Sequence, residues 1–134
     1  MLAEMGLASV PIVSDAALNE RDYGALTGLN KDEARQKFGP EQVHLWRRSF
    51  AVSPSGGESL RDTVARVLPF YVVHILPIIM QSNAVLIVAH GNSLRALLLV
   101  LEKLSADEIM QVELKTGEMR CYELGSNTQQ VDPL

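Results

Sequence analysis

The sequence predicts an α/β domain in which helices pack on a mainly parallel sheet. One observation is the uninterrupted apolar strand at 85–89, which is followed almost at once by a helix with an apolar face at 94–101. A second is that most of the remaining helical patterns lie between short strand candidates at 10–13 and 119–124. Strands separated by helices are typical of layered α/β folds.

Composition and charge indicate one globular domain over residues 1–134, with 47% hydrophobic and 21% charged residues. The net charge of −4 gives no reason to expect nucleic acid or an anionic membrane as a partner, although a local group of Lys and Arg still suits a small anion. The single cysteine, Cys121, favours a reducing, cytoplasmic compartment. The apolar stretches 64–80 and 94–101 are interrupted by charged residues or prolines, so we expect neither to span a membrane.

The chain opens on what looks like the end of a helix. Met1–Leu7 has the pattern of last turns closing on Gly6 without an N-cap, so we expect the start of this helix to belong to sequence that is absent here. A short strand at 10–13 and an ordered loop at 15–29 follow.

Helix starts are marked by paired capping residues. These pairs are Asn30 with Glu33, Ser59 with Asp62, and Ser105 with Glu108. The first of these helices is stopped by Gly39, and Pro40 suits the first position of the next. Pro69 and Pro77 are expected to kink or break the long helix that begins after Ser59.

Few strands can be found for a sheet of this kind. Beyond 10–13 and 85–89, only 119–124 has a strand pattern, and we expect the polar tail from Ser126 to be loose. This shortage fits a chain whose front part is missing.

His90 is the first residue suspected of chemistry. It ends the apolar strand, precedes Gly91 and stands at a helix start, where unpaired N–H groups can meet an anion. The alternative is a histidine satisfied by backbone contacts. His44 and His74 lie inside helical stretches, where packing or surface roles are expected.

A loop at 19–24 places an acid, a guanidinium and a phenol together, as Glu20, Arg21 and Tyr23. A carboxylate beside a cationic phosphate site can transfer protons, whereas alone the same loop is a solvated turn with a local ion pair. The candidate anion-binding cations are Arg21, Lys31, Arg47 and Arg48, and the alternative for each is a surface charge. Cys121 and Arg95 are expected to be structural.

Four sequence blocks, in order, resemble the cofactor-dependent phosphoglycerate mutases of the histidine phosphatase superfamily. They are Leu-Asn-Glu-Arg-Asp-Tyr-Gly at 18–24, Trp-Arg-Arg-Ser at 46–49, Gly-Glu-Ser-Leu-Arg-Asp-Thr at 57–63 and Ala-His-Gly-Asn-Ser-Leu-Arg at 89–95. Weaker matches follow at 115–118 and 122–124. The resemblance implies a three-layer α/β/α domain.

The resemblance also implies a role for each matching residue. Glu20 corresponds to the proton donor and acceptor toward the substrate hydroxyl, and His90 to the second active-site histidine, which stabilises the phosphoryl group in transit. The residues implied in substrate binding are Arg21, Asp22, Tyr23, Lys31, Arg47, Arg48, Gly91 and Asn92.

One departure from the family pattern concerns its nucleophile, a histidine in an Arg-His-Gly segment on the first strand. No Arg-His-Gly occurs in this sequence. We therefore expect residues 1–134 to be the rear portion of such a domain, incomplete, with the first central strand missing and apolar edge and face exposed. A second departure is Met119, where the family commonly has proline.

The activity implied by the resemblance is interconversion of 3-phosphoglycerate and 2-phosphoglycerate through a phosphohistidine. It implies 2,3-bisphosphoglycerate as phosphoryl donor, no metal, and a small phosphorylated three-carbon acid as substrate, with a homo-oligomer as one form of assembly. Because the nucleophile is absent, this chain alone is expected to be inactive. Two alternatives stay open: a histidine-type phosphatase acting on small phosphate esters, and a non-catalytic binding fragment.

Overall fold

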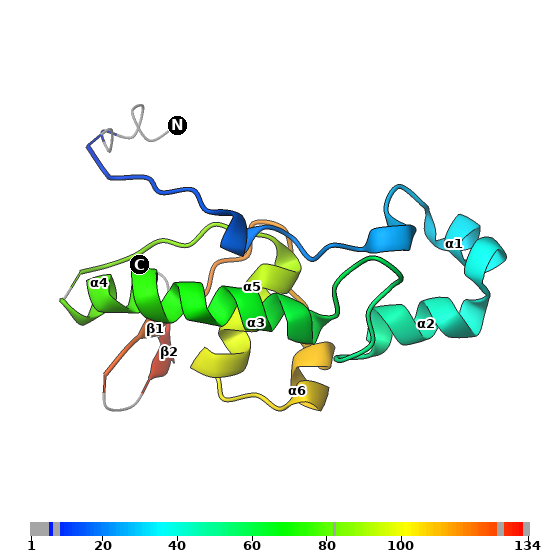
Figure 1. Cartoon of the computed structure of the whole chain (residues 1–134). Coiled ribbons are helices and arrows are strands. Elements are labelled where there is room, and N and C mark those ends of the chain that lie inside the picture. Colours follow the sequence, from blue (N-terminus) through cyan, green and yellow to red (C-terminus); the bar gives the residue numbers. More distant parts are fainter. Residues whose placement is uncertain (1–5, 7–8, 82, 126–127, 133–134) are drawn as a thin grey trace.

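The computed structural model describes residues 6, 9–81, 83–125 and 128–132. Its longest helical run is α3 (Leu60–Phe70), which passes through the π-helical turn η3 (Tyr71–Ile75) into α4 (Leu76–Met80), and α5 crosses it (Figure 1). The other elements are η1 (Ala16–Leu18), η2 (Gly24–Leu26), α1 (Lys31–Phe38), α2 (Pro40–Arg48), α5 (Gly91–Leu101), α6 (Ala106–Gln111), β1 (Cys121–Glu123) and β2 (Gln129–Val131).

The main core lies where α3 and η3 meet α5. Val67, Tyr71 and Ile75 are buried against Ala96 and Leu97, as the three-and-four spacing of both helices predicts. By length and composition alone, the run from Leu60 to Met80 is also apolar enough to cross a membrane. One face of this run packs against α5, and 22% of its apolar window is buried inside the molecule.

The sequence predicts that the two prolines kink or break this run, and the break does not occur. Helical residues continue without interruption from α3 to α4, and Pro69 lies inside α3. The irregularity takes the form of η3, between Pro69 and Pro77. A π-helical turn shifts the hydrogen-bond pattern, so the helix continues past residues that lack an N–H.

All three predicted capping pairs are confirmed as reciprocal capping boxes, at the starts of α1, α3 and α6. At α3, Ser59 donates from its backbone N–H and its hydroxyl to the Asp62 carboxylate, and these hydrogen bonds lower the pKa of Asp62. Pro40 is the first residue of α2, as predicted. Helices α1 and α2 pack together on a second core (Leu26, Ala34 and Val43) at the opposite end of the molecule from β1 and β2 (Figure 1).

The strand expected at 119–124 forms only as β1, and the tail expected to be loose contains its partner β2. The two pair antiparallel, with Tyr122 opposite Gln130. Polar side chains do not prevent this pairing, because backbone groups make the ladder and both exposed faces of β2 tolerate them.

The segments 10–13 and 85–89 are extended, but neither joins a ladder within the described residues. A strand needs a hydrogen-bonded neighbour, and neither segment makes a backbone hydrogen bond to another described segment, so the expected parallel pairing is not seen. Val13 and Val88 are each 83% exposed, which matches the open apolar face expected from the sequence. The helix end expected at 1–7 lies outside the described residues, apart from Gly6.

Candidate active site

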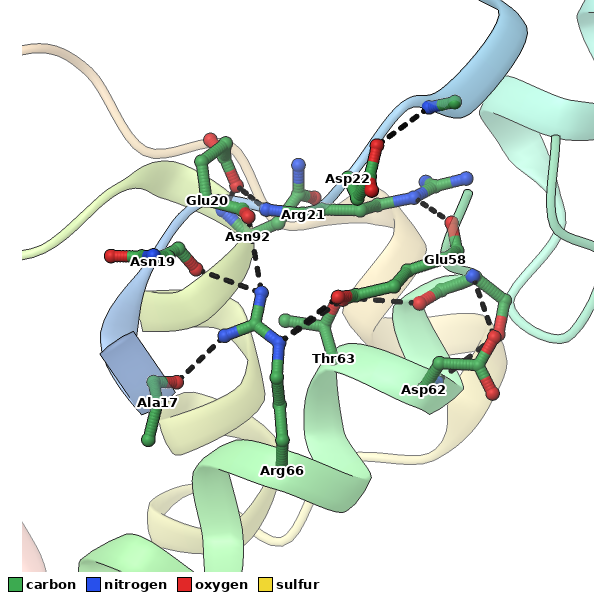
Figure 2. Close-up of polar contacts among 12 residues, drawn as sticks. Ala17, Asn19, Glu20, Arg21, Asp22, Glu58, Asp62, Thr63, Arg66 and Asn92 are labelled. Carbon is green, nitrogen blue, oxygen red and sulfur yellow. Dashed lines mark hydrogen bonds and ion pairs between the residues drawn. The ribbon is translucent and has the colours of Figure 1, made fainter. Parts of the chain in front are cut away.

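The loop between η1 and η2 carries Glu20 to the N-terminus of α5. Glu20 Oε1 accepts hydrogen bonds from the backbone N–H of Arg21 at 2.8 Å and of Asn92 at 3.2 Å (Figure 2). Asn92 is the second residue of α5, so the carboxylate lies at the positive end of the helix dipole. The anion that meets this helix start is therefore a side chain of the protein itself.

Tyr23 joins the same group through the side chain of Asn92. The amide Nδ2 of Asn92 donates to the Tyr23 hydroxyl at 2.8 Å. Arg95 donates to Asn92 Oδ1 at 3.2 Å and to the carbonyl of Val112 at 2.9 Å, which fixes the orientation of the amide. Asn92 is only 6% exposed, so Glu20, Tyr23 and Arg95 meet around a buried residue.

Arg21 belongs to this loop and is buried, with 4% of its surface exposed. Its Nε donates to the carbonyl of Glu58 at 2.6 Å and one terminal nitrogen donates to the carbonyl of Trp46 at 2.9 Å. The guanidinium carbon lies 5.2 Å from the centre of the Tyr23 ring, close enough for a cation–π contact. Burial lowers the pKa of Arg21, and the nearby Tyr23 and Glu20 oppose that shift. Arg21 thus braces the loop against the end of α2.

Tyr23 also borders a cavity of about 360 Å³. It is lined by Tyr23, Leu26, Thr27, Gly28, Leu29 and Arg47. The Nε of Arg47 is buried and has no hydrogen-bond partner among the described residues. A buried donor on a charged group is costly to leave unpaired. Arg47 also lines the cavity, and a guanidinium in such a wall suits an anionic ligand.

His90 is the N-cap residue of α5, and its imidazole is exposed. Its carbonyl accepts from the N–H of Leu94 and the hydroxyl of Ser93, whereas its imidazole makes no hydrogen bond within the described residues. The histidine borders a second hollow of about 310 Å³, together with Val13, Ser14, Asp15, Leu18, Asn19, Val88 and Ala89. The structure therefore places His90 two residues from Asn92, at a different hollow from Arg47.

The remaining predicted residues make no hydrogen bond to Glu20, Tyr23 or Asn92 in the described part of the chain. Lys31 begins α1 and Arg48 ends α2; both are exposed and neither makes a hydrogen bond or ion pair among the described residues. Asp22 accepts from the N–H of Gly24 at 2.8 Å, which shapes the turn, and Gly91 is the first residue of α5.

Sequence reasoning missed Glu58 and Arg66, which form an ion pair at 3.1 Å directly beneath the Glu20 loop (Figure 2). The available signal was Arg66 itself, a charged residue within the apolar run of α3. Such a residue needs a partner when it is partly buried.

Gly24 and Gly57 let the Glu20 loop lie against the turn before α3, because a Cβ at either position would meet backbone atoms of the other segment. A Cβ at Gly57 would lie 2.6 Å from the carbonyl oxygen of Asp22 and 2.7 Å from the N–H nitrogen of Gly24. The loops are also joined by hydrogen bonds from Ala25 to Ser55 and from Glu58 to Asp22. Only glycine at position 57 permits this contact without a backbone shift.

We expect Gly57→Ala to lower the free energy of unfolding by about 2 kcal/mol or more, because the added methyl meets backbone atoms that cannot rotate away. Urea denaturation of the purified chain measures the change. Gly125→Ala is the matched control, since a Cβ there meets nothing within 4 Å. Equal stability of the two variants would show that the loops are further apart than described.

The chain belongs to the histidine phosphatase superfamily (branch 1), whose family model matches residues 2–133. Among curated proteins it is 61% identical over 127 residues to a 2,3-bisphosphoglycerate-dependent phosphoglycerate mutase from Azorhizobium caulinodans, and 57% identical over 128 residues to one from Xanthobacter autotrophicus. These matches cover 95% and 96% of the chain, which spans 62% of the length of each relative.

Solved structures confirm the fold class. The chain aligns with a mycobacterial glucosyl-3-phosphoglycerate phosphatase in complex with inorganic phosphate at a TM-score of 0.71, covering 94% of this chain and 65% of that one at 22% identity. A vanadate complex of the same phosphatase aligns at a TM-score of 0.64 and 26% identity, covering 82% and 57% of the two chains. The structure is consistent with an incomplete α/β domain of this superfamily.

Proposed function

We propose that this chain supplies the substrate-binding and proton-transfer part of a phosphoglycerate mutase that interconverts 3-phosphoglycerate and 2-phosphoglycerate. The observation that carries the proposal is the hydrogen-bonded group of Glu20, Asn92 and Tyr23 beside a cavity where the buried Nε of Arg47 lacks a partner. Arg47 lines this cavity with Tyr23, and Tyr23 is linked through Asn92 to the Glu20 carboxylate. A guanidinium that suits a phosphate and a carboxylate that suits a hydroxyl therefore belong to one connected group.

Each residue has a distinct task in this proposal. Arg47 binds the phosphate or carboxylate of a three-carbon acid, and Tyr23 forms the wall between the cavity and Asn92. Glu20 holds the proton of the substrate hydroxyl. His90 stabilises the charge of the phosphoryl group in transit, since phosphoryl transfer is catalysed mainly by positioning and by electrostatic stabilisation. Lys31 and Arg48, which the resemblance implies in substrate binding, contribute further positive charge for the anionic groups of the substrate.

The residues present also fit 2,3-bisphosphoglycerate, which supplies the phosphoryl group when it is bound. This part of the proposal is supported by the orphaned Nε of Arg47, the chemistry of an anion-binding donor set and a cavity of about 360 Å³. The absence of a metal requirement and the assembly into a homo-oligomer stay predictions. We further propose that the substrate is a soluble cytoplasmic metabolite, so that no membrane or nucleic acid takes part.

We expect the purified chain to show no turnover with 2,3-bisphosphoglycerate and 3-phosphoglycerate above that of its own Glu20→Ala variant. The sequence has three histidines and none is in an Arg-His-Gly segment, so the family's phosphoryl acceptor is not among them. Formation of 2-phosphoglycerate, followed by ³¹P NMR, is the measurement.

The same assay separates the alternatives. Turnover of 3-phosphoglycerate above the Glu20→Ala control would overturn the expectation that this chain lacks the phosphoryl acceptor. Release of inorganic phosphate in place of 2-phosphoglycerate would favour the alternative function, a phosphatase. The structural similarity to a glucosyl-3-phosphoglycerate phosphatase is the observation that supports this alternative.

A further inference from the structure

Arg66 is the point on α3 at which the Glu20 loop is attached. Its Nη1 donates to the carbonyl of Ala17 at 2.7 Å, and its Nη2 donates to the carbonyls of Asn19 at 2.9 Å and Glu20 at 3.1 Å (Figure 2). Its Nε donates to both carboxylate oxygens of Glu58, at 3.2 and 3.1 Å. One guanidinium therefore joins three loop carbonyls and one carboxylate.

Glu58 holds the next residues of the same loop through its backbone. Its carbonyl accepts from the Nε of Arg21 at 2.6 Å, and its N–H donates to the carbonyl of Asp22 at 2.7 Å. The hydroxyl of Thr63 donates to the Glu58 carboxylate at 3.0 Å and fixes that side chain from below. The ion pair of Arg66, on α3, and Glu58, just before α3, therefore holds the loop from Ala17 to Asp22.

Few backbone hydrogen bonds hold this loop, although Leu18 packs against the main core. Within residues 15–20 of the described structure, the backbone–backbone hydrogen bonds are those of η1 and its cap, with no bond to another element. The neighbouring segment 10–13 belongs to no ladder. The hydrogen bonds from Arg66 are charge-assisted, and about three-quarters of its side chain is buried (26% exposed), so solvent screens them only partly.

We propose that Arg66 and Glu58 form a clamp that positions the Glu20 carboxylate against the N-terminus of α5, with Arg66 as a positioning residue for proton transfer. The role in proton transfer depends on the proposed function, whereas the clamp itself does not. With the carbonyls of Asn19 and Glu20 held by Arg66, the Glu20 carboxylate keeps its hydrogen bonds to the N–H groups of Arg21 and Asn92.

Amide hydrogen exchange in the purified full chain tests the clamp. In Arg66→Met we expect the N–H groups of Arg21 and Asn92 to exchange at least about tenfold faster, because several charge-assisted hydrogen bonds holding the loop are lost. The amides of Val67 and Leu97, in the core between α3 and α5, should keep their protection. Arg61→Met is the matched control, because Arg61 is exposed on the same helix and its side chain makes no hydrogen bond among the described residues.

A conservative variant guards against a general loss of stability. Arg66→Lys keeps the positive charge beside Glu58, but one ammonium group cannot replace both Nη1 and Nη2, which bind different carbonyls. We therefore expect the same faster amide exchange at Arg21 and Asn92, with the core amides unchanged. Uniform acceleration across Arg21, Asn92 and the core in both variants would reduce Arg66 to a general structural role. Unchanged exchange at Arg21 and Asn92 would also overturn the clamp.

The proposed function fails in a different way. If titration with inorganic phosphate leaves the Arg47 signals of the unmodified chain unchanged, the mutase proposal loses its binding site. The selective exchange at Arg21 and Asn92 would nevertheless stand. Faster exchange at those two amides in Arg66→Met, together with phosphate binding at Arg47, supports both.

Discussion

Glu20→Gln lowers kcat by about 10²- to 10⁴-fold in a hybrid enzyme, which is the range for losing one positioned proton-transfer group. This hybrid joins the chain to the portion of the Azorhizobium caulinodans relative that the chain does not match. Glutamine keeps the shape of the side chain and an oxygen that accepts from Arg21 and Asn92, but it cannot exchange a proton at working pH. We therefore expect kcat to fall while KM stays within a few-fold.

Steady-state conversion of 3-phosphoglycerate to 2-phosphoglycerate measures the effect. Glu113→Gln is the control, because Glu113 is exposed and makes no side-chain hydrogen bond in the described part of the chain. A Glu20→Gln hybrid that keeps its full kcat would remove the carboxylate from the chemistry and leave it as a brace for the loop.

His90→Ala is expected to lower kcat of the same hybrid by about 10²-fold or more, the scale for losing one preorganised charge-stabilising group. His90 ends the segment 85–89 and caps α5, so its imidazole stands beside the helix start that Glu20 also meets. The N-cap position survives the substitution, because the imidazole makes no capping hydrogen bond.

His44→Ala provides the comparison for this variant, since His44 is exposed on α2 and borders neither hollow. Circular dichroism of both variants checks that the helices remain. If kcat of the His90 variant equals that of the His44 variant, the histidine has no part in the mechanism.

The helices could be predicted because their signals are local. Asn30, Ser59 and Ser105 each bond to the third residue of their own helix, so the pattern in the sequence is also the contact in the structure. Pro69 shows the limit of this reasoning. Its effect depends on whether the surrounding core holds the helix together through a π-helical turn, and packing against α5 does so.

The sheet could not be predicted in the same way, because a strand depends on a neighbour that lies far away in the sequence. The segments 10–13 and 85–89 have strand patterns and are extended, yet they form no ladder. Gln129–Val131 has a polar pattern, yet it pairs with β1 because its backbone lies opposite a suitable partner.

The sequence named several residues that the structure brings together, and their roles stay predictions. Glu20, Tyr23 and Asn92 come together in the structure. The guanidinium of Arg21, in contrast, donates hydrogen bonds to the carbonyls of Glu58 and Trp46. The contribution of Arg66 is invisible in the sequence, because its partners are backbone carbonyls 46 to 49 positions earlier. Backbone carbonyls are present at every residue, so no motif marks them.

The most direct test of the central claim follows the Arg47 Nε–H signal by ¹⁵N NMR while 3-phosphoglycerate is added to the purified chain. The account predicts a saturable shift at Arg47, with slower solvent exchange of that proton and smaller shifts at Tyr23 and Asn92. Arg35, exposed on α1 and paired with Asp32, should not respond. Equal shifts at Arg35 and Arg47, or none at Arg47, would contradict a phosphate-binding cavity bordered by Tyr23 and Arg47.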